Sequence, residues 1–248
     1  MGTTYNLESV LRTNKPLDKA RWKAIVIHHS DSPVGSPESI AKEHTKLGFK
    51  GAMVHGLTHG ATIDFIDLKK YWPIFERAQA LDVPIYIHPA VPHQAVVDVY
   101  YKDYLKEFPF LLTAGWGFTV ETATQCIRLV LSGLFDQYPR LKIIVGHMGE
   151  GLPFLLWRIS QALSREGNKA RPFREVFREH FWITTSGNFS TAALLCSMME
   201  MGTDRILFSV DYPFVDNPPG TQWMQHVPVA TEDFKKIMSG NAERLLRL

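Results

Sequence analysis

Imidazole or carboxylate side chains stand at the ends of several short apolar runs in this sequence. These residues are His28 or His29, His88, His147 and Asp211. A short apolar run bounded by glycine or proline is typical of a buried strand. In parallel α/β sheets, functional groups gather at the carboxyl ends of the strands. One such residue alone is more typical of a turn, but the recurrence of the pattern favours a shared site.

The stretch 142–153, KIIVGHMGEGLP, is the most informative of these strand ends. His147 leaves the apolar run 143–145, and Glu150 follows three residues later. One interpretation is structural, with His147 capping a turn and Glu150 in the first turn of a helix. The other is functional: Glu150 orients the imidazole, and Arg158 pairs with Glu150 or with a substrate carboxylate. A surface or interface salt bridge is the alternative for Arg158.

Histidine and aspartate ligands together suit a divalent cation. Imidazole favours zinc, and carboxylate also accepts manganese or magnesium. A metal at such a position acts as a Lewis acid and holds an oxygen-rich substrate. The residue types at these strand ends therefore predict a metal-assisted reaction.

The elements that must position these groups follow from the apolar pattern. Strands are expected at 23–27, 51–55, 83–88, 143–145, 181–185 and 205–210. Helices are expected at 36–48, 68–81, 119–136, 153–165, 172–180, up to residue 201, 231–238 and 241–246. Strands that alternate with helices predict a parallel α/β sheet.

The length of 248 residues is close to the about 250 residues of a (β/α)8 barrel. We expect residues 1–22 to be an N-terminal extension and residues 23–248 to form a single barrel-like domain. Only six βα units are recognisable, so the barrel is expected to be incomplete or remodelled at its N-terminus. An open sheet needs cover for its edges, either from residues 1–22 or from a second chain.

Composition excludes several classes of protein. The net charge of +2 comes without a basic run, so nucleic acid is not an expected partner. No apolar run approaches the about 20 residues of a membrane span. The first residues are polar and include Pro16, unlike a signal peptide. Cys126 and Cys196 lie in apolar helical segments, as expected of thiols in the reducing cytoplasm.

Several motifs occur in an order that resembles a known family. They are LGFKGAMVHG (47–56), FERAQALDVPIYIHP (75–89), IIVGHMGEGLPFLLWRI (143–159), WITTSGNFST (182–191), DRILFSVDYPF (204–214) and NAERLL (241–246). Over about residues 47–248 the chain resembles the amidohydrolase-related decarboxylases, such as the γ-resorcylate, 2,3-dihydroxybenzoate, 5-carboxyvanillate and aminocarboxymuconate-semialdehyde decarboxylases. The resemblance implies a TIM-type (β/α) barrel, a divalent metal (zinc or manganese), a small aromatic carboxylic acid as substrate, and a homo-oligomer.

The resemblance also implies roles for individual residues. His88 and Asp211 match metal ligands, and His147 matches the catalytic histidine. Glu150 matches its acidic partner, and Arg158 matches the arginine behind it. In the family, the metal chelates the substrate carboxylate, a ring carbon is protonated with Asp211 or His147 in the proton path, and carbon dioxide leaves without an organic cofactor.

Three aromatic residues of the matched region have two interpretations. Trp116, Phe189 and Phe214 are candidates for the pocket around the substrate ring. Ordinary core packing is the alternative for all three.

The sequence departs from the family pattern at its N-terminal end. The family opens with a Glu-x-His or His-x-His strand, and no such motif occurs here. Residues 24–44, AIVIHHSDSPVGSPESIAKEH, instead resemble a fragment of zinc-dependent N-acetylmuramoyl-L-alanine amidases, where the histidine matching His28 binds zinc. We therefore expect His28 to join His88 and Asp211 as a third ligand. Adjacent strand residues face opposite sides, so only one of His28 and His29 can point inward.

Three functional hypotheses remain open on the sequence. The first is a metal-dependent decarboxylase of a phenolic or related unsaturated acid. The second is a metal-dependent hydrolase of the amidohydrolase or lactonase type. The third is a chimeric or truncated barrel whose metal site is inactive.

Overall fold

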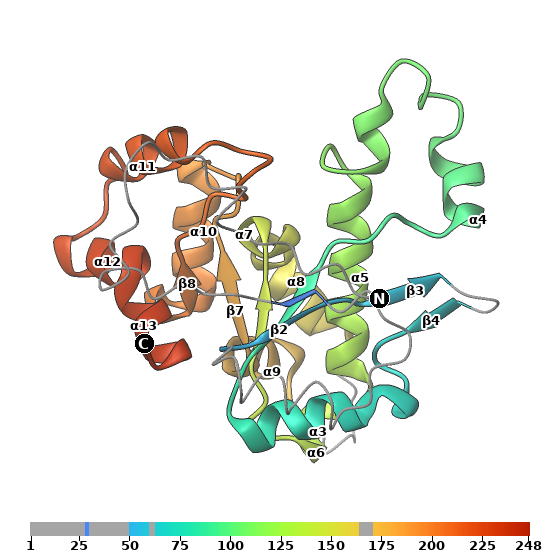
Figure 1. The fold of residues 1–248 in the computed structure, drawn as a ribbon, viewed down its shortest axis with the longest axis horizontal. Coiled ribbons are helices and arrows are strands. Elements are labelled where there is room, and N and C mark those ends of the chain that lie inside the picture. Colours follow the sequence, from blue (N-terminus) through green and yellow to red (C-terminus); the bar gives the residue numbers. More distant parts are fainter. Residues whose placement is uncertain (1–27, 30–49, 60–62, 164–170) are drawn as a thin grey trace.

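A parallel sheet forms the centre of the molecule (Figure 1). The computed structural model describes residues 28–29, 50–59, 63–163 and 171–248. Its six parallel strands are β1 (His28–His29), β2 (Ala52–His55), β5 (Ile85–His88), β6 (Ile143–Val145), β7 (Phe181–Thr184) and β8 (Ile206–Leu207). They pair in the order β1-β2-β5-β6-β7-β8, which is their order along the chain. This confirms the expected α/β fold, and five of the six expected strands are among the described residues.

Helices and a hairpin connect these strands. The longer helices are α3 (Trp72–Leu81), α5 (Gly117–Leu131), α8 (Leu152–Leu163), α9 (Phe173–His180), α10 (Thr191–Met201) and α11 (Asn217–Gln225). The shorter ones are η1 (Lys69–Tyr71), α4 (Gln94–Val96), η2 (Val97–Tyr101), η3 (Pro109–Leu112), α6 (Leu134–Gln137), α7 (His147–Glu150), η4 (Thr203–Arg205), α12 (Thr231–Lys235), η5 (Lys236–Gly240) and α13 (Asn241–Leu246). A two-stranded antiparallel hairpin, β3 (Leu57–His59) and β4 (Ile63–Phe65), follows β2.

The edges of the sheet are β1 and β8. Among the described residues no strand pair joins them, so these six strands form an open sheet. The expected boundary between residues 1–22 and the barrel domain lies outside the described residues, as do the expected strand 23–27 and helix 36–48. None of the helices in the described part of the chain is long and apolar enough to cross a membrane.

Strand register decides which residues are level with one another. His55 is the register partner of His88, so these two residues lie side by side at the carboxyl ends of β2 and β5. His28 is the partner of Ala52, and Ala52 is the partner of Ile85. The backbone of His28 therefore lies three residues before the level of His88, about 10 Å along the strand direction.

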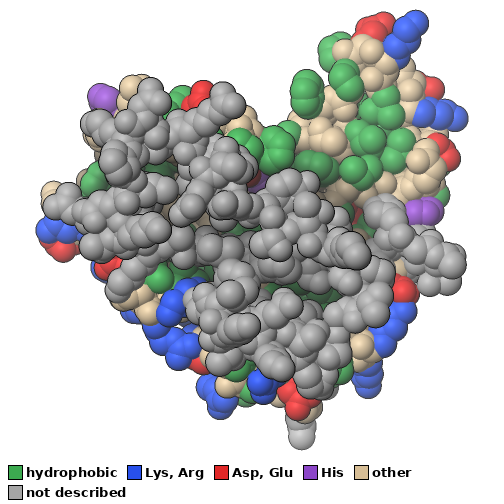
Figure 2. Space-filling model, in the orientation of Figure 1, with side chains coloured by type: hydrophobic (Ala, Val, Ile, Leu, Met, Phe, Trp, Pro, Cys, Tyr) green, Lys and Arg blue, Asp and Glu red, His purple; other side chains and the backbone are tan. Residues whose placement is uncertain are grey.

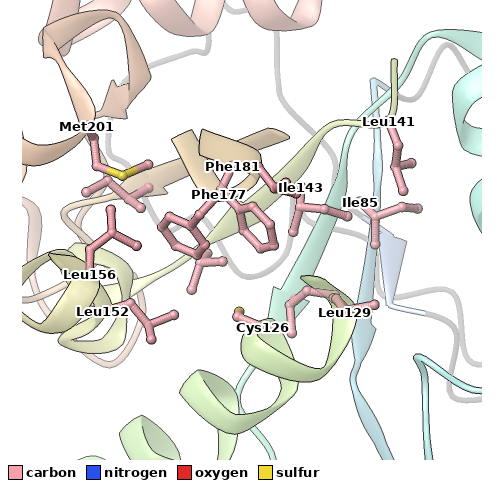
Figure 3. Close-up of a cluster of buried hydrophobic side chains, with 14 of the residues drawn as sticks. Ile85, Cys126, Leu129, Leu141, Ile143, Leu152, Leu156, Phe177, Phe181 and Met201 are labelled. Carbon is pink, nitrogen blue, oxygen red and sulfur yellow. The ribbon is translucent and has the colours of Figure 1, made fainter. Parts of the chain in front are cut away.

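The face of the sheet that meets the helices is apolar. Alternate residues of the central strands, such as Ile85, Ile143 and Phe181, are buried in one large cluster. Figure 3 shows Leu129 of α5 and Leu156 of α8 in the same cluster, beside the strand residues. Alternation along a strand places the intervening residues on the opposite face.

The opposite face carries a smaller cluster and the polar groups of interest. Ile144 and Leu207 are buried there with Leu245 and Leu246 of α13, and Tyr86 packs against them. Tyr86 and His88 are two residues apart on β5, so they share this face. The sheet therefore has one fully apolar side and one side that becomes polar toward the carboxyl ends.

Two expected elements are shorter than the sequence pattern suggests. The strand expected at 205–210 contains only Ile206–Leu207, because the backbone N–H of Phe208 donates to Ile237 of η5 and leaves the sheet. The helix expected at 119–136 is interrupted at Gly133, which has a φ of 82°. There the Ser132 hydroxyl accepts from the backbone N–H of Leu134 and starts α6 afresh.

A segment rich in aromatic residues projects from the sheet at the upper right of Figure 1, around α4. It includes η2, η3 and the start of α5. Several of its large side chains are exposed, namely Val99, Tyr100, Tyr104, Phe108, Phe110 and Trp116. Figure 2 shows hydrophobic side chains gathered on this projection.

Candidate active site

The turn that follows β6 brings His147 back onto Glu150. The Nδ1 atom of His147 donates to Oε1 of Glu150 over 2.5 Å. His147, Met148 and Glu150 all have positive φ values, and so do Gly149 and Gly151. A Cβ on Gly149 would lie 2.9 Å from a methyl carbon of Ile183, so glycine is needed there for both backbone and space.

The Glu150 carboxylate is buried and has two donors. Only 3% of the residue is exposed. His147 Nδ1 bonds one carboxylate oxygen, and the hydroxyl of Thr119 on α5 donates to the other over 2.8 Å. A buried carboxylate is stable only when such donors replace water. Glu150 therefore holds the imidazole in one orientation, with a proton on Nδ1.

The other ring nitrogen of His147 faces Asp211. Nε2 lies 3.8 Å from Oδ2 of Asp211, and both side chains are partly exposed to solvent. Burial lowers the pKa of His147, but the carboxylates of Asp211 and Glu150 outweigh it and raise the pKa to about 9. Strand ends β6 and β8 thus place a proton-bearing imidazole between two carboxylates.

Backbone strain is concentrated at the same strand ends. Seven non-glycine residues of the described part have positive φ, and five of them follow β6, β7 or β8: His147, Met148, Glu150, Ser186 and Asp211. Non-glycine residues rarely adopt this conformation, and such residues cluster at functional sites. The strain is therefore an independent indication that this edge of the sheet is the site.

His88 and His55 form a second pair of imidazoles at this edge. Their ring centroids are 4.9 Å apart and the rings meet edge to face. Nδ1 of His88 and Nδ1 of His55 both contact the carbonyl oxygen of Pro89, at 2.8 and 2.9 Å. Burial lowers the pKa of His88, and the imidazoles of His55 and His147 lower it further. A neutral imidazole with Nδ1–H donated to a carbonyl presents Nε2 as the ligand nitrogen.

The donor set for a metal is only partly within the described residues. His88 lies near enough to Asp211 and His147 to interact with both electrostatically. No group of three histidine, cysteine, aspartate or glutamate side chains in the described part is placed to hold one ion. The chemistry of His88 and Asp211 fits a divalent cation, and further ligands have to come from elsewhere. The side chain of His28, the expected third ligand, lies outside the described residues.

Arg158 does not pair with Glu150 in this arrangement. It lies exposed on α8, and the structure shows no ion pair between it and Glu150, whose oxygens are bonded to His147 and Thr119. Its neighbours Phe154 and Trp157 are exposed as well. The position of Arg158 on α8 therefore differs from the expected pairing with Glu150.

The three candidate aromatics are not in the core. Trp116 and Phe214 are 52% and 84% exposed, so core packing is the wrong interpretation for them. Phe189 is half-buried and stacks on Trp223 with ring centroids 5.5 Å apart. None of the described contacts places these rings against His147.

Sequence reasoning missed two residues of the site. Thr119 belongs to a helix far from the motif, and no local pattern links it to Glu150. His55 was detectable, because it ends an expected strand in the same way as His88 does.

We expect Thr119→Val to destabilise the protein, because it leaves one oxygen of the buried Glu150 carboxylate without a donor. The free energy of unfolding, measured by urea denaturation, should fall by about 1–3 kcal/mol. Thr124→Val is the matched control on the same helix, since the exposed Thr124 hydroxyl bonds only to Val120 of its own helix. Equal losses for the two variants would show that Thr119 does not support Glu150.

Comparison with known proteins agrees with this geometry. The family model described as "Amidohydrolase" matches residues 18–248, a range that includes the 24–44 segment. A γ-resorcylate decarboxylase of Polaromonas sp. is 41% identical over 228 residues, which is 87% of this chain and 68% of that protein. One from Rhizobium sp. is 40% identical over 236 residues, covering 92% of this chain and 71% of that protein.

A solved structure gives the same result for the fold. The dihydroxybenzoic acid decarboxylase of Polaromonas sp., with bound manganese and 2-nitroresorcinol, superposes with a TM-score of 0.77 at 42% identity. The match covers 86% of this chain and 66% of that chain, so the present chain spans about two thirds of its length. The fold of these relatives is the expected TIM-type barrel. By sequence and by structure, the chain belongs to the amidohydrolase family and resembles the decarboxylases within it.

Proposed function

We propose that this chain is a metal-dependent, non-oxidative decarboxylase of a phenolic or related unsaturated carboxylic acid. The observation that carries the proposal is His147, held by the buried Glu150 and facing Asp211 at the carboxyl ends of β6 and β8. The relatives named as γ-resorcylate and dihydroxybenzoate decarboxylases support this reaction and a small dihydroxybenzoate-like substrate.

The reaction needs one proton delivered to a ring carbon. Protonation of the carbon that bears the carboxylate allows the carbon–carbon bond to break, with its electrons returning to the ring as carbon dioxide leaves. We assign the holding and transfer of that proton to His147 Nε2 and the Asp211 carboxylate, and their separation of 3.8 Å supports this assignment. Glu150 keeps Nδ1 occupied, so that the exchangeable proton is on the side of the substrate.

A divalent cation is part of the proposal. When bound, it would supply positive charge for the substrate carboxylate and its neighbouring hydroxyl. We propose His88 and Asp211 as ligands, with His28 as the third. Manganese is favoured over zinc because solved decarboxylases of the family are described with bound manganese.

For Arg158 we retain the proposal that it binds the substrate carboxylate. The residue is exposed on α8, as a group that meets a substrate anion has to be. Arginine is well suited to planar carboxylates. Because α8 begins directly after the His147 turn, the residue is on an element that the site already positions.

We expect the purified protein, supplied with Mn²⁺, to convert a dihydroxybenzoate to the corresponding phenol and carbon dioxide. The His147→Gln variant should lose about 10²–10⁴-fold in kcat, because the proton donor is gone. Arg158→Ala should mainly raise KM. The fall in absorbance of the aromatic acid, followed for each member of a panel of hydroxybenzoates, gives kcat and KM for both variants.

The control for this assay is His226→Gln, since His226 is an exposed histidine at the end of α11. It should retain full activity. Hydrolysis of lactones or amides without loss of any hydroxybenzoate would contradict the proposal and favour the hydrolase hypothesis.

We expect the protein to bind Mn²⁺ or Zn²⁺ through His88, and the His88→Ala variant to lose that metal because a ligand nitrogen is removed. Inductively coupled plasma mass spectrometry after dialysis gives the stoichiometry. A matched His28→Ala variant tests the third ligand directly.

The two variants separate the possible ligand sets. Loss of metal from both supports His28 as a ligand together with His88. An unchanged stoichiometry in His28→Ala removes it from the set, in keeping with a backbone position three residues before the level of His88. Full metal content in His88→Ala would contradict the metal site itself.

We also propose that two copies of the chain meet through α8. The helix buries Leu152 and Leu156 in the core and exposes Phe154 (81%) and Trp157 (62%) on its other side. Large apolar side chains exposed together are typical of an interface between proteins. This supports the homo-oligomer that the family resemblance implies.

We expect Trp157→Glu to lower the molar mass of the particle measured by light scattering, because it places a charge in the contact. Phe110→Glu is the matched control, since Phe110 is also an exposed aromatic residue (73%), on the projecting segment. A particle of unchanged mass in Trp157→Glu, or a monomer in the unmodified protein, would contradict an interface at α8.

A further inference from the structure

A cluster of hydroxyl groups lies next to the site, on the face of the sheet that carries Tyr86 and His88. Its members are Tyr86 on β5, Thr184 at the end of β7, Ser186 just after β7, and Ser209 just after β8. We call these four residues the hydroxyl cluster. Thr184 and Ser186 are almost fully buried, and the large apolar side chains of Ile144 and Leu207 lie on the same face.

The cluster is connected by short contacts. The Tyr86 hydroxyl lies 3.3 Å from Thr184 Oγ1 and 3.2 Å from Ser186 Oγ. Thr184 and Ser186 are 2.5 Å apart, and Ser186 and Ser209 are 2.7 Å apart, each between hydroxyl oxygens. The backbone N–H of Ser186 also donates to the Ser209 hydroxyl over 3.2 Å. Three strands are thereby joined through side chains.

The number of protons determines what the cluster can do. Each hydroxyl group has one proton to donate. The contacts among the cluster oxygens are as many as its hydroxyl protons, so every proton is used within the cluster when all contacts are hydrogen bonds. A cluster that is satisfied internally holds its members in place and does not offer a proton to substrate.

The hydroxyl cluster contacts the segment that carries His147 and the segment that carries Asp211. A Cβ built on Gly146, the residue before His147, would lie 2.8 Å from the Tyr86 hydroxyl oxygen. The next nearest atoms, both of Ser186, would be 3.8 Å away. Tyr86 therefore lies directly against the chain that carries His147.

On the other side, the cluster reaches the chain that carries Asp211. Ser209 precedes Asp211 by two residues. The hydroxyl of Thr185 donates to the carbonyl oxygen of Ser209 and accepts from its N–H, so the backbone of Ser209 is held at both ends. Ser186 has a φ of 27° and Asp211 a φ of 71°, and such conformations persist only where the surroundings enforce them.

We propose that Tyr86, acting through the hydroxyl cluster, is a positioning residue that sets His147 Nε2 against the Asp211 carboxylate. The inference rests on the proposed function, because it assigns these two groups to the proton path. Its physical basis is that the Tyr86 hydroxyl lies against Gly146 on one side and reaches Ser209 through Ser186 on the other. Errors of about 1 Å between reacting groups cost on the order of 10²-fold in rate.

The first test is Tyr86→Phe, with Tyr138→Phe as the matched control. Tyr138 is also buried but packs against Trp72, away from the site. We expect Tyr86→Phe to lower kcat roughly tenfold or more with little change in KM or metal content, and Tyr138→Phe to leave kcat unchanged. Loss of thermal stability without loss of kcat in Tyr86→Phe would overturn the inference and leave only a structural role.

The second test uses the close approach to Gly146. Its φ of −74° is accessible to alanine, so Gly146→Ala introduces only the clash with the Tyr86 oxygen. We expect Gly146→Ala to lower kcat in the unmodified protein and to have a several-fold smaller effect in the Tyr86→Phe background. Equal effects in the two backgrounds would show that Tyr86 does not act on the His147 segment.

A third readout does not depend on activity. The ¹⁵N signals of the His147 imidazole, assigned with His147→Gln, should shift in Tyr86→Phe and stay unchanged in Tyr138→Phe. Unchanged signals in both would overturn the inference. A protein that shows these shifts but decarboxylates nothing would refute the proposed function while preserving the positioning contact.

Discussion

The site depends on one physical requirement: the buried carboxylate of Glu150 must have hydrogen-bond donors in place of water. Glu150 is stable in the interior only because His147 and Thr119 donate to it, and a buried charge without such partners costs several kcal/mol. To place the imidazole on a carboxylate three residues later, the chain turns through left-handed conformations at Met148 and Gly149. The same requirement brings α5 against this turn, since Thr119 lies near the start of that helix.

One face of the sheet contributes mainly to stability, and the other carries the polar groups of the site. The face that meets the helices is a continuous apolar cluster, which secures the strands without polar groups that need satisfying. The other face becomes polar only near the carboxyl ends, where hydroxyls and imidazoles satisfy one another. The polar contacts run between strands. The register of the strands therefore also determines the geometry of the site.

The sequence predicted the parts of the structure that depend on local pattern. Apolar runs located β2, β5, β6 and β7 closely, and the spacing of His147 and Glu150 anticipated their contact. What the pattern did not predict depends on tertiary partners: β8 is cut short by η5, and Glu150 pairs with His147 and Thr119 and not with Arg158. Thr119 could not be foreseen, because nothing near it in the chain indicates which helix residue will face a distant carboxylate.

The shared carbonyl of Pro89 has a consequence for how this rim can change. His55 and His88 each use the same backbone oxygen to fix the ring proton, and that oxygen belongs to neither side chain. Replacement of His55 therefore leaves the acceptor for His88 in place. A substitution at position 55 would remove the ring that meets His88 edge to face and one cause of its lowered pKa, while the acceptor that fixes the His88 ring proton stays.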